Sequence, residues 1–341
     1  MAARAFITGL AGLAIAGSER AFLREASPWG LILFKRNINT PQQVSDIVRD
    51  FRDTVGWEAP VLIDQEGGRV ARLGPPHWPV YPPGARYSAI YDRDPTSGLA
   101  AACLAGHLIA ADLAALGIDV DCLPIADVPV AGHDPIIGDR AYGSEPGKVA
   151  AIAGAVAEGL LAGGVLPVLK HLPGHGRANA DSHLKLPVVS TDRATLEKTD
   201  FAAFVPLRNL PLGMTAHVVF SAIDPASPAT TSVTIVSQVI RGFIGFTGLL
   251  MSDDVSMGAL SGTIAERSHA ALAAGCDVVL HCNGDLAEMS QVAGAAPELV
   301  GVAAQRAQAA LAARRGREEF DVAAARRIFN EMVASESGRP V

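Results

Sequence analysis

The chain has 341 residues, and its 28 Lys and Arg against 35 Asp and Glu give a formal charge of −7 at pH 7. Hydrophobic residues make up 49 % of the chain and charged residues 18 %, which is enough apolar material to bury a sizeable core and excludes the disordered and fibrous classes. An acidic chain without runs of Lys and Arg is poorly suited to neutralise a phosphate backbone, so nucleic acid is not an expected partner.

Residues 1–17 carry one Arg, Arg4, and an apolar run of the kind found in secretory signals. Gly9, Gly12 and Gly17 interrupt that run, so we interpret Ala5–Gly9 as a buried first strand followed by a turn. Gly or a charged residue also interrupts the other apolar stretches before they reach the length of a membrane span. An integral membrane protein is therefore not expected.

Eight short apolar runs predict strands, and longer Ala-rich amphipathic stretches between them predict helices. The predicted strands are Ala5–Gly9, Gly30–Phe34, Val61–Gln65, Asp119–Leu123, Val165–Lys170, Gly213–His217, Gly248–Ser252 and Asp277–His281. The predicted helices include Pro41–Val55, Gly98–Leu116, Glu145–Ala162, Thr195–Asn209, Ser232–Arg241 and Ile264–Ala274, with Val302–Arg314 and Val322–Ser335 packed outside as terminal helices. Apolar strands that alternate with helices indicate a parallel sheet, and eight units favour a closed (β/α)₈ TIM barrel over a doubly wound open sheet.

No internal repeat, linker or block of charge divides the chain. We interpret it as one domain, 1–341, with a barrel core over about 5–290 and C-terminal helices over about 297–335. The four cysteines show no CxxC spacing, so neither a disulfide framework nor a zinc site is expected, and the reducing cytoplasm is the expected compartment.

Polar residues stand at the carboxyl ends of six successive predicted strands. They are Asp64, Asp121, Lys170 with His171, His217, Asp253 and Asn283. In an α/β barrel these strand ends meet at one mouth, where the chemistry of such enzymes lies. One or two of these residues could be satisfied core polar groups, but six at the same end favour a functional site.

The segment VLIDQEGGRVARL places Asp64 and Arg72 around two glycines. Asp64 offers a pair of acceptors for neighbouring hydroxyls and Arg72 a planar fork of donors, but an ion pair that only holds the turn fits the pattern equally well. Arg140 lies on a Gly-flanked loop before a predicted helix, either as an ordinary loop charge or as a group that reaches the barrel mouth.

The segment KHLPGHGRANADSHLKLP forms a long loop after Lys170 and His171, and long loops in compact domains are usually functional or disordered. Asp181 and His183 are two positions apart, so a carboxylate can orient the imidazole as an acid/base group. Alternatively, Asp181 caps a turn and His183 is solvated. In MSDDVSMGA, adjacent side chains point to opposite sides of a strand, so one of Asp253 and Asp254 faces the barrel axis as a nucleophile, base or cation ligand.

These segments resemble glycoside hydrolase family 3, in particular the bacterial β-N-acetylhexosaminidases of the NagZ type. The resemblance rests on LILFKRNI, LIDQEGGRVARL, LPIADV, GDRAYG, KHLPGHGRANADSH, TAH and MSDDVSMGA, which run in family order between residues 31 and 260. It implies that Asp253 is the nucleophile and that His183 is the acid/base, with Asp181 as its orienting partner. It also implies that the terminal N-acetylglucosamine is held by Asp64, Arg72, Arg140, Lys170 and His171. GDR in place of the commoner GER and DDV in place of DDL are mild departures.

The implied activity is that of a retaining exo-β-N-acetylglucosaminidase. By this resemblance it removes terminal β-linked N-acetylglucosamine from anhydro-muropeptides during cell-wall recycling in the cytoplasm, as a monomer that needs no cofactor and no metal. A family-3 β-glucosidase or a glycoside phosphorylase is the alternative among enzymes, since a His acid/base does not repel phosphate as a carboxylate does. A sugar-binding barrel without catalysis is the alternative outside enzymes.

Overall fold

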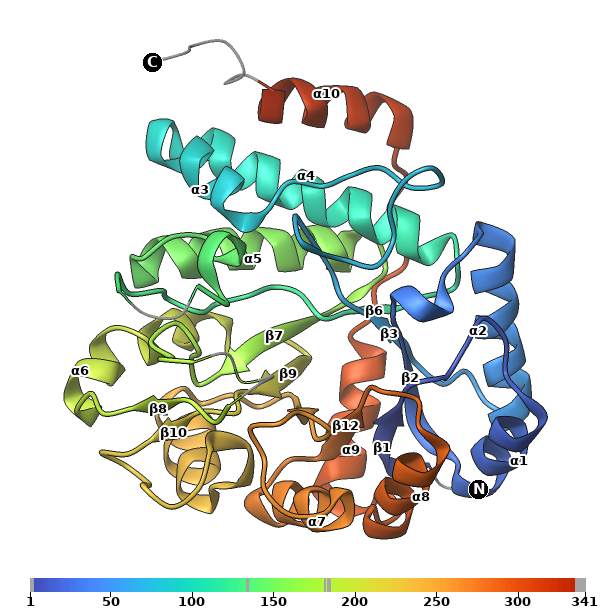
Figure 1. The fold of residues 1–341 in the computed structure, drawn as a ribbon. Coiled ribbons are helices and arrows are strands. Elements are labelled where there is room, and N and C mark those ends of the chain that lie inside the picture. The colour runs from blue at the N-terminus through green and yellow to red at the C-terminus, as the bar shows by residue number, and fades with distance from the viewer. Residues whose placement is uncertain (1–2, 133–134, 181, 183–184, 335–341) are drawn as a thin grey trace.

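The computed structural model describes residues 3–132, 135–180, 182 and 185–334. Its centre is a closed barrel with strand order β1-β12-β11-β9-β7-β6-β3-β2, and each neighbouring pair is parallel (Figure 1). The barrel strands are β1 (Arg4–Thr8), β2 (Pro28–Leu33), β3 (Val61–Ile63), β6 (Val120–Asp121), β7 (Leu166–Leu172), β9 (Leu212–Thr215), β11 (Leu249–Asp254) and β12 (Val278–His281). The prediction of a closed (β/α)₈ barrel is confirmed.

Helices surround the barrel. They are α1 (Gly17–Ala26), α2 (Pro41–Val55), α3 (Gly84–Arg93), α4 (Pro95–Ala114), α5 (Pro146–Ala162), α6 (Arg193–Lys198), α7 (Ile264–Ala274), α8 (Leu286–Ala295), α9 (Gly301–Ala312) and α10 (Val322–Ala334). Helix α4 is long and apolar enough to cross a membrane by length and composition, but 56 % of that stretch is buried inside the fold. Its contacts are with α3, α5 and α10, so it is a core helix of the outer layer.

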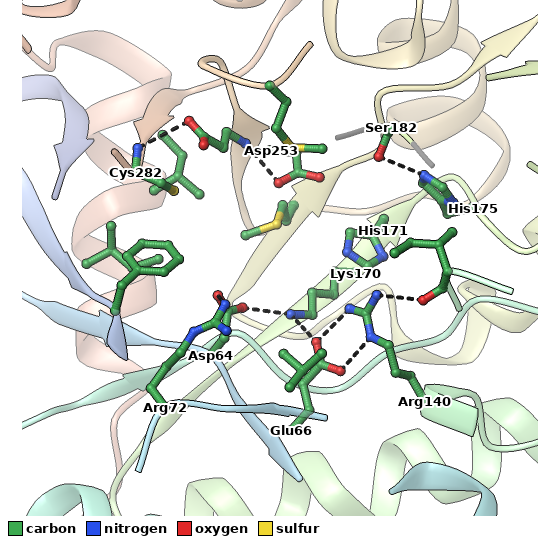
Figure 2. Close-up of a pocket in the computed structure, with 18 of the residues that line it drawn as sticks. Asp64, Glu66, Arg72, Arg140, Lys170, His171, His175, Ser182, Asp253 and Cys282 are labelled. Atoms are coloured by element: carbon green, nitrogen blue, oxygen red, sulfur yellow. Dashed lines mark hydrogen bonds and ion pairs between the residues drawn. The ribbon is translucent and has the colours of Figure 1, made fainter. Parts of the chain in front are cut away.

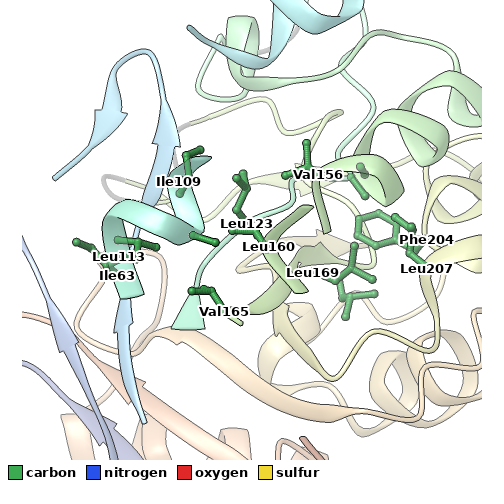
Figure 3. Packing of buried hydrophobic residues seen from close by; sticks show 14 of the residues in the cluster. Ile63, Ile109, Leu113, Leu123, Val156, Leu160, Val165, Leu169, Phe204 and Leu207 are labelled. Carbon is green, nitrogen blue, oxygen red and sulfur yellow. The ribbon is translucent and has the colours of Figure 1, made fainter. Parts of the chain in front are cut away.

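The strands are apolar along their whole length because successive side chains point alternately into the barrel and toward the helices. Leu62 and Ile63, for example, belong to two different clusters of buried apolar side chains. Figure 3 shows the outer cluster, in which Leu123 and Leu169 pack among side chains such as Leu160 of α5. The barrel is thus held from both sides, and its strand ends are fixed in position.

Most of the predicted elements are confirmed within one to three residues, but the predicted helix Thr195–Asn209 is wrong. After α6 the chain continues as two short 3₁₀ turns, Phe201–Ala203 and Val205–Leu207. Pro206 prevents a continuous helix through the second of these turns, because proline in a helix interior removes a donor and clashes with the preceding turn. Helix α6 itself ends earlier, at Lys198. The predicted helix Ser232–Arg241 is wound as a π-helix over Ile235–Phe243.

Several elements were not predicted. Helices α1, α3 and α8 are among them, together with two small sheets that lie outside the barrel. One sheet pairs β4 (Gln65–Gly67) with β5 (Val70–Ala71), and the other pairs β8 (Val188–Val189) with β10 (Val219–Phe220). The β4–β5 hairpin directly follows β3 and contributes to the site described next.

Candidate active site

A cavity of about 440 Å³ opens at the carboxyl ends of the barrel strands. It is lined by the six predicted site residues that fall within the described part of the chain: Asp64, Arg72, Arg140, Lys170, His171 and Asp253. Figure 2 shows these side chains, which come from distant segments, facing a common space. They meet because the carboxyl ends of parallel strands converge at one end of a barrel. The volume suits a small polar ligand.

The β4–β5 hairpin brings Arg72 back against Asp64. Gly67 and Gly68 have φ values of 97° and 56°, and a Cβ on Gly67 would lie 2.4 Å from a backbone oxygen of the following segment. Glycine is therefore required for this tight turn. The side-chain oxygen of Gln65 accepts the backbone N–H of Arg72 at 2.9 Å, which fixes the returning strand.

Two carboxylates and three cations form a continuous network on one wall of the cavity (Figure 2). Lys170 Nζ lies 2.9 Å from Asp64 Oδ1 and 2.6 Å from Glu66 Oε1. Arg72 Nη2 donates to Asp64 Oδ2 at 2.9 Å. Arg140 binds Glu66 through two parallel hydrogen bonds of 2.8 and 2.7 Å. Such charge-assisted, bidentate contacts hold the side chains in one arrangement before a ligand arrives.

The charges of this network are fixed over the physiological pH range. Burial alone would raise the pKa of Asp64, but Lys170 and Arg72 hold that pKa well below its usual range. Burial alone would also raise the pKa of Glu66, but Lys170 and Arg140 hold that pKa below its usual value. Burial lowers the pKa of Lys170, but the two carboxylates raise it above its usual value. Ionised carboxylates only accept hydrogen bonds, so this wall is suited to binding hydroxyl groups.

A second group of buried polar residues lies at the end of β7. Asp127 Oδ2 is 2.7 Å from His171 Nδ1, and Asp127 Oδ1 accepts the backbone N–H of His175 at 2.6 Å. Burial raises the pKa of Asp127, but His171 and His175 lower it below the usual range. A carboxylate that accepts from Nδ1 leaves Nε2 of His171 to face the cavity with a defined orientation.

We predict that Asp127→Asn lowers the free energy of unfolding by about 1–3 kcal/mol, because an amide group cannot replace both hydrogen-bond-accepting oxygens in this buried position. It should also raise KM, because His171 loses the partner that orients its ring. Urea unfolding and steady-state kinetics measure the two effects. Unchanged stability together with unchanged KM would contradict the orienting function of Asp127.

Asp253 is the second-last residue of β11 and is half-buried at the cavity wall. Its backbone N–H donates to Thr215 Oγ1 at 3.3 Å, and its Oδ1 accepts the backbone N–H of Asp254 at 2.8 Å. Burial would raise the pKa of Asp253, but His217 and His171 lower it below the usual range. The side chain is therefore an ionised carboxylate beside the cavity, as a nucleophile requires.

The sequence left the function of Asp254 open. In the structure, its carboxylate accepts hydrogen bonds from other groups of the protein. Its Oδ1 accepts the backbone N–H groups of Ser256 and Cys282 at 2.9 and 3.2 Å, and its Oδ2 accepts the Ser256 hydroxyl at 2.6 Å. Its carbonyl oxygen lies 2.9 Å from Nε2 of the buried His217. With all these contacts made within the protein, Asp254 shapes the loop that follows Asp253.

Asp181 and His183 lie outside the described residues, so the predicted acid/base pair stays a prediction. Ser182 is buried, lines the cavity, and its Oγ is 3.1 Å from Nε2 of His175. Burial and the neighbouring His171 lower the pKa of His175 to about 4, so its ring is neutral near pH 7.

The other polar strand ends differ from the prediction in part. Asn283 lines the cavity, whereas Asp121 and His217 are fully buried and are not among its lining residues. Conversely, Glu66 and His175 line the cavity, and the fully buried Asp127, which does not line it, contacts His171 from behind. None of the three was assigned as a site residue from the sequence, although Glu66 stands beside Asp64 in the same motif. Among the described residues, no group of three or more His, Cys, Asp and Glu side chains is arranged to hold a metal ion.

Comparisons with known proteins agree with this architecture. The glycosyl hydrolase family 3 N-terminal domain matches residues 8–313. A β-hexosaminidase of Alkalilimnicola ehrlichii is 40 % identical over 284 residues, which cover 81 % of this chain and 79 % of that protein. NagZ from Neisseria gonorrhoeae, solved in complex with N-trifluoroacetyl-D-glucosamine, is similar in structure with a TM-score of 0.85 at 28 % identity, over 99 % of this chain and 98 % of that one.

A β-N-acetylhexosaminidase from Beutenbergia cavernae is also similar, with a TM-score of 0.77 at 28 % identity, over 91 % of this chain and 96 % of that one. The family match spans nearly the whole barrel, including each strand end that contributes to the cavity. The closed barrel, the ionised Asp253 and the network around Lys170 are the setting in which sugar hydrolysis is expected. The chain therefore belongs to glycosyl hydrolase family 3 and is a glycoside hydrolase.

Proposed function

We propose that this protein is a retaining exo-β-N-acetylglucosaminidase that releases terminal β-linked N-acetylglucosamine from peptidoglycan fragments. The observation that carries the proposal is the ionised carboxylate of Asp253 on the same cavity as the Asp64–Lys170–Glu66 network. The names of the relatives support the type of sugar, as does the glucosamine derivative bound to the gonococcal NagZ.

The network is proposed to bind the terminal sugar. The lone pairs of Asp64 that Lys170 and Arg72 leave free can accept sugar hydroxyls, and the guanidinium of Arg140 offers donors. Nε2 of His171 offers an acceptor, because Nδ1 of the same imidazole donates to Asp127. Because the ion pairs already hold these groups, little conformational entropy is lost on binding. A terminal sugar held in this way presents its anomeric carbon to Asp253.

The proposed reaction has two steps. In the first, the Asp253 carboxylate attacks the anomeric carbon, the glycosidic C–O bond breaks, and His183 gives a proton to the departing oxygen. In the second, His183 takes a proton from water, the water oxygen attacks the anomeric carbon, and the bond to Asp253 breaks. Two displacements retain the β configuration. Asp181 is proposed to orient His183 in both steps.

The proposed substrates are disaccharides of N-acetylglucosamine and anhydro-muramic acid, with or without peptide, and the proposed setting is cell-wall recycling in the cytoplasm by a monomer. These parts of the proposal rest on the resemblance of the motifs. Digestion of purified anhydro-muropeptides, with products identified by mass spectrometry, tests the substrate. Size-exclusion chromatography with light scattering tests the monomer, and cell fractionation tests the compartment.

The decisive experiment for the mechanism is trapping. A 2-fluoro or 5-fluoro sugar slows the second step, so the enzyme accumulates as a covalent glycosyl-enzyme whose modified peptide mass spectrometry identifies. The adduct is expected on the peptide that contains Asp253. An adduct located elsewhere would contradict the assignment. Hydrolysis of aryl glucosides in preference to aryl N-acetylglucosaminides would favour the β-glucosidase alternative, and acceleration by phosphate with release of a sugar 1-phosphate would favour a phosphorylase.

We predict that His183→Ala lowers kcat/KM for a natural disaccharide by about 10²–10⁴-fold, the usual contribution of a general acid. The loss should be much smaller for a dinitrophenyl N-acetylglucosaminide, because its leaving group departs without a proton. Kinetics on both substrates measure the difference. Equal losses on the two substrates would contradict the assignment of His183 as the general acid.

A further inference from the structure

Asp121 is a buried carboxyl group directly behind the sugar-binding wall, and the reaction proposed above does not use it. It ends β6 and is fully buried. Its Oδ1 accepts the backbone N–H of Gln65 at 2.9 Å, and Gln65 lies in the sequence between Asp64 and Glu66. Its Oδ2 is buried and has no hydrogen-bond partner in the part of the chain that the structure describes. Asp121 thus supports the backbone that carries both carboxylates of the network.

The charged and titratable groups around Asp121 come from four neighbouring segments and from the residue that directly follows β6. They are Lys170 on β7, Asp64 at the end of β3, Glu66 on β4, Tyr142 in the loop before α5, and Cys122 next to Asp121 itself. Lys170 is already paired with Asp64 and Glu66. No ion pair to Asp121 is present among the described residues, so its charge would face two ionised carboxylates without a cation of its own.

We propose that Asp121 is a positioning residue that works as a neutral carboxylic acid and keeps Asp64 and Glu66 in their binding arrangement around Lys170. An unpaired charge in a buried position is more costly than retention of a proton. Loss of that proton adds a third negative charge beside Lys170. The ionised Asp121 carboxylate then competes with Asp64 and Glu66 for the ammonium group. Because Gln65 also holds the backbone of Arg72, the disturbance reaches both sides of the sugar-binding wall. This inference rests on the proposed function of that wall.

The pKa of Asp121 sets the pH at which the effect appears. Burial raises that pKa to about 8, although the Gln65 N–H and Lys170 oppose the increase. Asp121 is therefore protonated below this pH and ionised above it, so substrate affinity should fall as the pH rises through about 8. If only the protonated form binds substrate well, kcat/KM at pH 9 is roughly tenfold below its value at pH 7.

The test compares the pH profile of kcat/KM in the wild-type enzyme and in Asp121→Asn, with an aryl N-acetylglucosaminide as substrate. The amide keeps an oxygen for the Gln65 N–H and stays neutral at every pH. In the variant, kcat/KM is expected not to decrease above pH 8. In the wild type, the decrease in kcat/KM is expected to come mainly from an increase in KM. Asp119→Asn is the matched control, because Asp119 precedes the same strand but pairs with Arg52 and Arg314 away from the cavity.

Identical profiles for wild type and Asp121→Asn would overturn the proposal, as would a uniform loss of activity that only follows the folded fraction. Infrared difference spectroscopy gives a readout that does not depend on catalysis: the wild-type protein at pH 7 should show the C=O stretch of a buried protonated carboxyl that disappears as the pH rises past 8. Absence of that band would also overturn it. If the band titrates but the wild type hydrolyses no glycoside, the proposed function fails while the proton on Asp121 stands.

Discussion

Replacement of Asp253 by Asn is expected to lower kcat by roughly 10⁴-fold or more, because an amide cannot form the covalent bond to the anomeric carbon that the proposed mechanism assigns to Asp253. The change keeps the size of the side chain and an oxygen for the Asp254 N–H. The network around Lys170 is untouched, so the affinity for N-acetylglucosamine should change little. Release of an aryl alcohol from an aryl N-acetylglucosaminide measures the first effect, and calorimetric titration with N-acetylglucosamine measures the second.

Asp254→Asn is the matched comparison, because it changes the adjacent carboxylate in the same way. Asp254 accepts hydrogen bonds from Ser256 and Cys282, so its replacement should lower thermal stability and impair activity through the loop. Among folded molecules, its activity should exceed that of Asp253→Asn by a wide margin. Near-normal turnover by Asp253→Asn, or equal losses in the two variants, would refute the assignment of the nucleophile.

The sequence predicted the barrel because the physical cause of each strand is local. A parallel strand buried on both faces must be apolar along its length, and such runs are visible without knowledge of their neighbours. The same logic found Lys170, His171 and Asp253, because a polar group at the end of an apolar strand is costly unless it lies at a site. Part of the failure at Thr195–Asn209 came from ignoring a local signal, the proline at position 206, which cannot lie inside a continuous helix. The end of α6 at Lys198 has no comparable signal in the sequence.

Contacts between distant segments could not be predicted in this way. Glu66 lies 74 positions from Arg140, and Asp127 lies 44 positions from His171. Separations of this size do not predict which residues are in contact. Strand-end position alone also failed to separate Asp64, which lines the cavity, from Asp121, which lies buried behind it. Which face a terminal residue presents depends on where the strand ends and how the next segment turns, and the tertiary structure decides both.

Lys170→Met is expected to lower the free energy of unfolding by about 3–5 kcal/mol at pH 7, the usual cost of removing one partner from a buried ion pair. Lys170 is buried, and its ammonium is the shared partner of Asp64 and Glu66. Methionine fills nearly the same space but leaves the two carboxylates close together with less positive charge. Urea unfolding measures the loss. Lys148→Met is the matched control, because Lys148 pairs with the exposed Asp92, and such pairs contribute about 0–1 kcal/mol.

The pH dependence of this loss has a defined sign. In the wild type, the lowered pKa values of Asp64 and Glu66 contribute stability that is present above their unfolded pKa values and is lost as the pH falls through the folded ones. In Lys170→Met, the pKa values of Asp64 and Glu66 in the folded protein rise. Protonation therefore removes the repulsion between the two carboxylates as the pH falls below about 5, near the unfolded pKa values of carboxyl groups. The difference in stability between wild type and variant should therefore be largest at pH 7 and shrink toward pH 4. A difference that grows as the pH falls would contradict the network as the source of the stability, because only ionised carboxylates need the lysine.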